Sequence, residues 1–394
     1  MMIQAVLGNP NHPEYGVATI PFPIPHDQYA HCMELLEALE IGDAVKTDCK
    51  VEAVDSFFSV LKRTEMLTVN VEELNYLAKR LDSFDTGEAA QFQAMAHKLE
   101  LFELKDLINL TFCCQQATVI TDFSDLAAIG RNHYMNLHGG SASVDELNAL
   151  DGKETARQLI ENCGGTITPY GVVYDNGMKL EPVYDGRFFP CYYYEPNAIT
   201  VAVTSKAEPE DTEHITWLFL PMIQEEVDRA LLRGGITDPA DARLRLEDSQ
   251  LPNEVDVLLD MEYETLFDLN ELAAATDGLS NADMEKLGAV VMLAKPKSAA
   301  QIKNLVESLD LFDFAPGAHT PQEYGKYMIQ QSGHFDYDEN LDAFYDYEKY
   351  GTERMNEEDG MFTGRGYIAY KGYTSLAEIM DGNQSSRIEM GGMA

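Results

Sequence analysis

The sequence has 394 residues, of which 67 are acidic and 28 basic, so the formal net charge is −39. Hydrophobic residues make up 45% and aromatic residues 10% of the chain, which predicts two or three folded domains and excludes a disordered acidic tail. The charge excludes nucleic acid and anionic membranes as direct partners, because their phosphates would repel it.

The N-terminal sequence and the cysteines predict a cytoplasmic protein. "MMIQAVLGNPNHPEYG" lacks the basic and apolar regions of a signal peptide, and no apolar run reaches the roughly 18 residues of a membrane span. The six cysteines lie in the first half and have no CxxC spacing, which is typical of reduced thiols.

The first half begins with a predicted strand in "YGVATIPFPI" (15–24) and a helix over 26–41, where Leu35, Leu36 and Leu39 recur at helical spacing. A helical stretch is expected at about 51–112. The half ends with a helix, a glycine pair and strands in "GGTITPYGVVYDNG" (164–177).

The second half shows the same order of predicted elements. Strands in "ITVAVTS" and "ITWLFL" flank a predicted hairpin loop at 205–214, and a helix over 223–234 carries Val227, Leu231 and Leu232 at helical spacing. A helical stretch follows at 266–309, with Ser280 as a predicted N-cap and Asp283 three residues later. The final strands are expected in "DGMFTGRGYIAYKG" (359–372).

The two halves also share residues at a constant offset of 195 positions. "LNYLA" (74–78) recurs as "LNELA" (269–273), and 13 of the 98 residues from 74 to 171 are identical to their counterparts. We therefore predict an elongated α+β protein of two tandem repeats. Each repeat has a small antiparallel sheet plus helix, a helical middle and a C-terminal α/β hairpin subdomain. The expected domains are 1–187 and 188–394, the latter with subdomains at about 188–255, 256–333 and 334–394.

Motifs for catalysis, phosphate binding or metal binding are missing. The sequence contains no GxGxxG, GxxxxGK[ST], HExxH or GxSxG, and the nine histidines complete no zinc set. Asp336, Asp338 and Asn340 match the first ligands of an EF-hand loop, but Leu341 and Tyr347 replace the required glycine and glutamate. We predict no catalytic residue, no metal and no cofactor.

The acidic residues are most crowded between 335 and 360, and we call these residues the acidic segment. The segment has ten acidic residues, two bases and six aromatic rings, which we expect to be buried while the acids face outward. Its candidate binding residues are Asp336, Asp338, Glu339, Asp342, Asp346, Glu348, Glu353, Glu357, Glu358 and Asp359. A second candidate cluster consists of Glu225, Glu226 and Asp228. Such an array of fixed negative charge is typical of a surface that imitates a nucleic-acid backbone.

A resemblance to a known family rests on four stretches. These are 338–372, 267–293, the strands and helix between 192 and 232 and, more distantly, "AVLGNPNHPEYGVATIPFPI". They resemble the ArdA antirestriction proteins of bacterial conjugative elements, including conjugative transposons. The resemblance implies elongated dimers that are not enzymes. It also implies that they mimic bent B-form DNA and occupy the DNA groove of type I restriction-modification enzymes, at the methyltransferase core.

The tandem arrangement departs from this family, which has one copy per chain. We expect either a homodimer or an intramolecular pseudo-dimer of the two halves, which a mass measurement in solution distinguishes. Two other functions stay open. One is an acidic binding or regulatory module of a mobile element with another basic protein partner. The other is a hydrolase or metal enzyme that uses scattered carboxylates.

Overall fold

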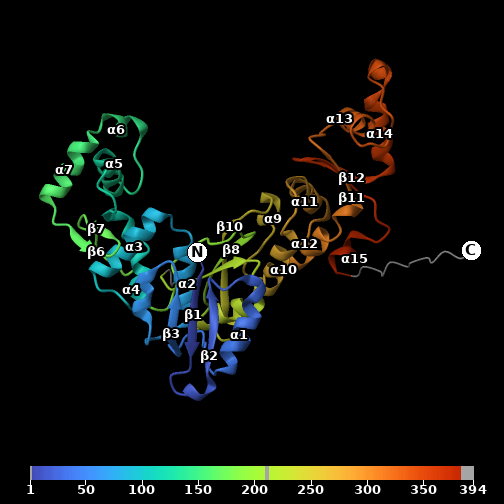
Figure 1. Cartoon of the computed structure of the whole chain (residues 1–394). Helices are drawn as coiled ribbons and strands as arrows, with labels where there is room; N and C mark the ends of the chain where they lie inside the picture. The colour runs from blue at the N-terminus through green and yellow to red at the C-terminus, as the bar shows by residue number, and fades with distance from the viewer. Residues whose placement is uncertain (1, 209–212, 383–394) are drawn as a thin grey trace, which may run out of the picture. The chain divides into compact units, whose positions relative to one another are not determined.

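A computed structural model describes residues 2–208 and 213–382 (Figure 1). Helices alternate with four small sheets, and every strand pairing recorded within them is antiparallel, so the predicted α+β class is confirmed. The chain divides into two compact units. Unit 1 comprises Met1–Glu195, Glu213–Thr216 and Asp228–Thr237, and unit 2 comprises Pro196–Thr212, Trp217–Val227 and Asp238–Ala394.

Unit 1 begins with a sheet of strand order β2-β1-β3-β4 and the helix α1. Its central strand β1 alternates in burial, with Ile3, Ala5 and Leu7 fully buried, which is the period-two pattern of a strand with one face in the core. The elements are β1 (Ile3–Gly8), β2 (Val17–Phe22), α1 (Tyr29–Ala38), β3 (Cys49–Asp55) and β4 (Thr68–Val69).

The expected helical stretch at 51–112 is wrong in its first twenty residues. These residues form β3, the short 3-10 helix η3 (Ser59–Thr64) and β4. Cys49 and Val51 are buried on alternate positions of β3, and a register shift opposite Val6 and Leu7 moves the next buried position to Val54, so the helical spacing of Val51 and Val54 comes from an irregularity in a strand. The rest of the stretch is helical as expected, and its helices are α2 (Val71–Asp82), α3 (Thr86–Lys98) and α4 (Leu104–Leu110).

Unit 1 continues with a three-stranded sheet of order β5-β7-β6, against which helices pack. The strands predicted in 164–177 are confirmed as β6 and β7. The elements are β5 (Thr118–Ile120), α5 (Leu126–Leu137), α6 (Val144–Ala149), α7 (Gly152–Asn162), β6 (Thr166–Thr168) and β7 (Gly171–Tyr174).

Unit 2 contains the sheet β10-β8-β9, a helical middle and the sheet β11-β13-β12. The predicted loop at 205–214 joins the neighbouring strands β8 and β9, and its residues 209–212 lie outside the described residues. This first part consists of β8 (Ile199–Ser205), β9 (Thr216–Leu220), α8 (Gln224–Arg233), β10 (Ala242–Ser249) and α9 (Asn253–Asp256). Thr216 and the end of α8 belong to unit 1.

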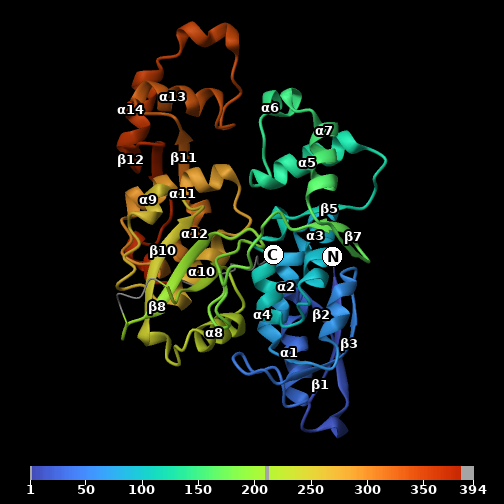
Figure 2. The same ribbon diagram turned by 90° about the vertical axis from the view of Figure 1, so that its left-hand side faces the viewer.

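The predicted helical stretch at 266–309 is confirmed as α10 (Leu266–Thr276), α11 (Asn281–Ala294) and α12 (Ala299–Val306). Ser280 and Asp283 form the predicted capping box of α11. The final sheet lies beside α13 and α14 in both ribbon views (Figures 1 and 2). Its elements are β11 (Phe312–Pro316), α13 (Pro321–Gln330), α14 (Tyr347–Glu357), β12 (Asp359–Thr363), β13 (Gly366–Tyr370) and α15 (Leu376–Met380).

The end of α8 is an integral part of unit 1. Arg233 is only 5% exposed, and its guanidinium donates to the carbonyl oxygen of Ala44 at 3.0 Å and to the side chain of Asn70 at 3.0 Å. It also lies over the ring of Phe189, 4.4 Å from the ring centroid. Because these partners satisfy a buried charge, residues 228–237 need the N-terminal half to complete their environment.

The two units have similar strand orders, β2-β1-β3 and β9-β8-β10 in the first sheet and β5-β7-β6 and β11-β13-β12 in the second, with helices between the sheets and β4 added in unit 1. In each unit the first strand is central in the first sheet, and the last strand is central in the second sheet. Asn75 of "LNYLA" and Asn270 of "LNELA" make equivalent hydrogen bonds. The first accepts a hydrogen bond from the Ile24 amide at 2.9 Å, and the second accepts one from the Met222 amide at 2.8 Å. These agreements support the tandem repeat, which stays a prediction.

A second pair of asparagines binds the segment that follows the last strand of each unit. Asn109 donates to the Tyr184 carbonyl oxygen at 3.1 Å, and its counterpart Asn304 donates to the Met380 carbonyl oxygen at 2.9 Å. Both asparagines therefore hold the segment that follows the last strand of their own unit. The offset of 195 positions links residues that have the same structural role.

We predict that Asn75→Ala and Asn270→Ala each lower the free energy of unfolding by about 1–3 kcal/mol, because a backbone amide loses its acceptor. Chemical denaturation of each variant measures the loss. Asn148→Ala is the control, since Asn148 is exposed on α6 and should change the stability by less than about 0.5 kcal/mol. Equal stability of all three variants would contradict the assigned role of the "LN" motif.

Candidate functional site

The acidic segment is supported by the close crossing of α13 and α14. Thr320 caps α13 by accepting from the Glu323 amide, and Asp346 caps α14 by accepting from the Lys349 amide. At the crossing, a Cβ atom on Gly325 would lie 2.0 Å from the Tyr347 carbonyl oxygen, and one on Gly351 would lie 1.9 Å from that of Pro321. Only glycine permits this approach, which fixes α14 against α13.

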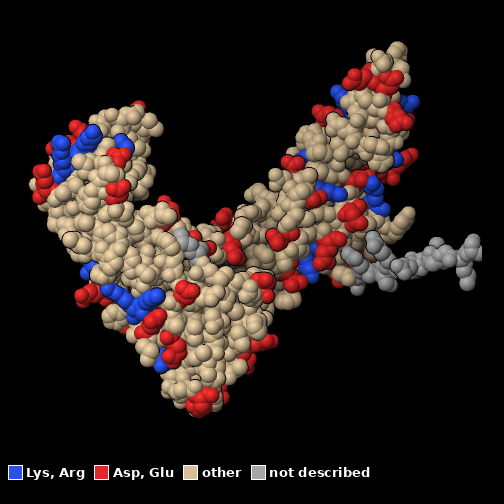
Figure 3. Space-filling model, in the orientation of Figure 1, with Lys and Arg blue, Asp and Glu red and all other residues tan. Residues whose placement is uncertain are grey.

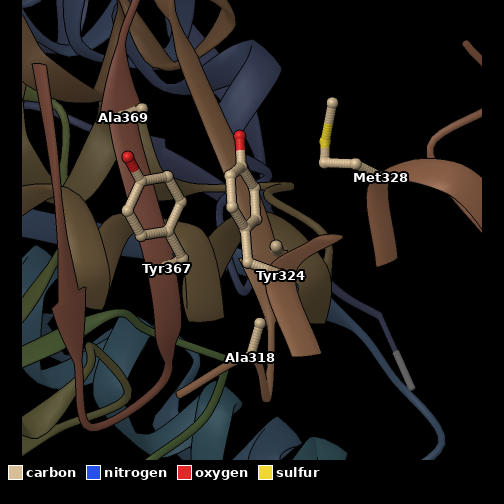
Figure 4. Close-up of a cluster of buried hydrophobic side chains, with 6 residues drawn as sticks. Ala318, Tyr324, Met328, Tyr367 and Ala369 are labelled. Atoms are coloured by element: carbon tan, nitrogen blue, oxygen red, sulfur yellow. The ribbon is translucent and has the colours of Figure 1, made fainter. Parts of the chain in front are cut away.

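A small core lies beneath the two helices. It contains Tyr324, Met328, Tyr367 and three alanines, and the rings of Tyr324 and Tyr367 have their centroids 4.2 Å apart (Figure 4). The Tyr324 hydroxyl donates to a carboxylate oxygen of Glu358 at 2.6 Å. Burial raises the pKa of Tyr324, and it raises that of Tyr367 to about 12, so both hydroxyls stay protonated at neutral pH.

Nine of the ten candidate acids of the acidic segment are exposed. The exception is Glu358, which is half-buried, receives the Tyr324 hydroxyl and forms an ion pair with Arg354. Glu353 and Glu357 each lie within 4.0 Å of a base. Within the described ranges 2–208 and 213–382, seven acids form no ion pair: Asp336, Asp338, Glu339, Asp342, Asp346, Glu348 and Asp359.

Acidic side chains are visible over both units in Figure 3, and several lie on the part of the surface that α13 and α14 form. The structure thus exposes the carboxylates that the sequence nominates there. Their negative charge is presented to solvent by a folded scaffold.

The expected burial of all six rings is wrong at two positions. Phe335 is 50% exposed and Phe344 is 83% exposed, while the four tyrosines are half-buried. The expected helical pattern is interrupted as well. A 3-10 helix, η7 (Glu339–Phe344), precedes α14, which begins only at Tyr347. Asp338 starts η7 by accepting from the Asn340 amide at 2.9 Å.

Asp342 holds this connection between α13 and α14 together. One of its carboxylate oxygens accepts from the Tyr337 hydroxyl at 2.8 Å, from the Gln330 side chain at 2.8 Å and from the Tyr347 hydroxyl. The hydrogen bond from Tyr347, followed by that from Tyr337, lowers the pKa of Asp342. Asp342 is therefore both an exposed charge and the link between the two helices.

The second candidate cluster lies on α8 and has no element in common with the acidic segment. Glu225 and Asp228 are exposed and Glu226 is half-buried. Val227 and Leu231 form the predicted buried face of α8, but Leu232 is 46% exposed, because it lies beside that face and not within it. The structure therefore places the three acids together on one helix but does not join them to residues 335–360.

Sequence reasoning missed Tyr324, Tyr367 and Gln330, which support the acidic segment from outside it. The hydrogen-bond partners of Tyr324 and Gln330 lie 7 to 34 positions away, and no spacing rule connects them. In the part of the chain that the structure describes, no group of three or more His, Cys, Asp or Glu side chains is arranged to hold a metal ion. No helix in the described ranges is both long and apolar enough to cross a membrane.

The arrangement is a folded surface that presents negative charge to solvent. Residues 212–369 match the family model described as antirestriction protein (ArdA). The match covers less than half of the chain, and this region is similar to that antirestriction family. A search of the curated proteins finds no match. The family match begins at residue 212, so the relation of the N-terminal half to the family stays a proposal.

We predict opposite effects for the two tyrosines of the core. Tyr324→Phe should cost about 1–3 kcal/mol of unfolding free energy, because one carboxylate oxygen of the half-buried Glu358 loses the hydrogen bond that the Tyr324 hydroxyl donates. Tyr367→Phe should be neutral or stabilising, because the buried Tyr367 hydroxyl has no hydrogen-bond partner among the described residues. Thermal unfolding measures both. A loss of stability in Tyr367→Phe similar to that in Tyr324→Phe would contradict this account of the core.

We predict that Asp342→Ala frees the connection between α13 and α14 without unfolding unit 2. Amide hydrogen exchange should become faster in residues 335–347 and stay unchanged in α11. Folding lowers the pKa of Asp342. The stability that its carboxylate gives to the connection is therefore fully present above the ordinary pKa of about 3.9, and it is lost as the pH falls through the lower pKa of the folded state. Protection in the wild-type segment should therefore persist at pH 5. Loss of that protection between pH 7 and pH 5 would contradict the assignment.

Proposed function

We propose that the chain is an antirestriction protein that mimics the charge of B-form DNA. In this proposal it blocks the DNA-binding groove of type I restriction-modification enzymes, at their methyltransferase core. The family match of residues 212–369 supports the antirestriction function. The observation that carries the mimicry is the set of seven exposed acids that form no ion pair with any described residue, on a hydrogen-bonded scaffold.

The acidic segment concentrates negative charge in a short part of the chain. It has ten acids and two bases in residues 335–360, a net charge of 2 − 10 = −8. Duplex DNA carries one phosphate charge per about 1.7 Å, so a charge of this size corresponds to about 14 Å of duplex. A cationic groove that binds DNA would meet that charge on the protein.

In this proposal the carboxylates bind the partner and do not catalyse a reaction. Many exposed acids that act together give an affinity that depends strongly on salt, because each charge is screened over about 10 Å at 0.1 M ionic strength. A hydrolase would instead depend on one or two particular carboxylates. We also propose that the chain acts in the cytoplasm of a bacterium that carries a conjugative element, where unmodified incoming DNA meets restriction enzymes.

A transfer assay tests the function directly. The chain is expressed in a host that restricts, and unmodified DNA is introduced by conjugation or transformation. Survival of that DNA, with no gain in a host that lacks the restriction enzyme, is the expected result. If the chain binds a basic protein but gives no protection, the alternative of a regulatory module with another partner is correct.

We predict a graded loss of affinity when the exposed acids are neutralised. Each change of Asp to Asn or Glu to Gln among Asp338, Glu339 and Glu348 should weaken binding to a type I methyltransferase by about 0.2–1 kcal/mol, as for other exposed charges. The triple variant should also show a smaller dependence of affinity on salt concentration.

The control for this series neutralises three exposed acids of unit 1, namely Asp27, Glu34 and Glu37. It removes the same charge from another part of the chain and should have a smaller effect on affinity. Complete loss of binding on a single substitution would contradict collective action, and equal losses in both triple variants would contradict the location of the surface.

A further inference from the structure

The connection between α13 and α14 exposes large apolar side chains among the acids. Phe335, Leu341 and Phe344 are 50%, 47% and 83% exposed, and they lie within ten residues of one another. Single exposed apolar residues are common on protein surfaces and need no explanation. Three exposed apolar side chains in one short connection form an apolar patch within the most acidic part of the chain. Solubility alone does not explain such a patch, because charged side chains would serve it better.

These apolar side chains are carried by a segment that is held in place. Phe344 is the last residue of η7, which begins at the Asp338 cap. Asp342, two residues before Phe344, is bonded to Gln330 of α13 and to Tyr347 of α14. The ring of Phe344 is therefore presented by a backbone that is tied at both ends, so little conformational entropy is lost when a partner covers it.

The charges around Phe344 restrict what can cover it. The exposed acids Asp342 and Asp346 flank it in the chain, and Asp338 and Glu339 begin the same 3-10 helix. An anionic membrane or an acidic protein surface would be repelled by these carboxylates. A purely apolar surface would leave them desolvated and unpaired, which is costly. Charge complementarity therefore selects a partner surface that is cationic at its rim and apolar at its centre.

A groove that binds DNA has this combination. Its cationic side chains meet phosphates, and enzymes that act on a base take the base out of the stack into a pocket lined by aromatic or apolar side chains. We propose that Phe344, with Leu341 beside it in η7, inserts into such an apolar recess of the methyltransferase. Its ring then lies where a base of the bound DNA would lie, while the flanking acids meet the cationic rim. This inference rests on the proposed function and adds an apolar contact to it.

Substitution of the ring tests the inference. Phe344→Ala should weaken binding to a purified type I methyltransferase by about tenfold or more, since full burial of such a side chain stabilises by about 1.5–3 kcal/mol. The dependence of affinity on salt should be unchanged, because no charge is removed. Phe344→Leu should recover part of the affinity. The control is Phe267→Ala, which removes a ring that is 63% exposed on α10 and should bind like the wild type.

The outcomes separate this inference from the proposed function. If the wild-type chain does not bind the methyltransferase, the proposed function fails. If the wild type binds and Phe344→Ala binds equally well, the function stands and the inserted ring is wrong. A weaker salt dependence in Phe344→Ala, or faster amide exchange at 335–347, would mean that the charges have moved, and this would also overturn the inference. Equal losses in Phe344→Ala and Phe267→Ala would overturn it as well.

Discussion

The close packing of α13 against α14 is the interaction on which the acidic surface depends. Ten carboxylates in 26 residues repel one another, so only attractive contacts elsewhere can hold them in one place. Gly325 and Gly351 supply the close backbone approach, and the core around Tyr324 and Tyr367 supplies the apolar contacts. Hydrogen bonds from tyrosine hydroxyls to Glu358 and Asp342 then use two of the acids themselves as structural acceptors. The remaining acids are left to face solvent.

The scaffold and the charge are separate properties of this fold. In unit 1, α5 and α7 cross at Gly130 and Gly152 in the same way, and a Cβ atom on Gly130 would lie 1.8 Å from the Gly152 carbonyl oxygen. Residues 122–165 of that unit have seven acids and three bases, whereas residues 317–360 of unit 2 have eleven and three. The same arrangement of helices and strands thus carries a net charge of −4 in one unit and −8 in the other. The crossing of the helices does not require the larger negative charge, so that charge is a property of unit 2 that is separate from the packing of its helices.

The sequence predicted the elements whose signal is local. The helices at 266–309, the cap at Ser280 and the strands after each glycine pair follow from periodicity, capping and turn residues. The strands β1 and β3 were missed although Ile3, Ala5 and Leu7 alternate with other residues, because short strands give weak patterns.

The exposure of the acids could be predicted from composition, but the contacts that orient the acids could not. Glu358 meets Tyr324 across 34 residues, and only the folded sheet brings them together. The exposure of Phe344 was mispredicted for the same reason, since an aromatic ring in a helical pattern is ordinarily buried.

The central claim is that the acidic surface occupies the place of DNA on its target. Competition between the chain and a duplex for a purified type I methyltransferase tests this claim most directly, for example by fluorescence anisotropy of labelled DNA at several salt concentrations. The account predicts mutually exclusive binding, with the DNA fully displaced by the chain and recovered at higher DNA concentration. A ternary complex of enzyme, DNA and chain would contradict it.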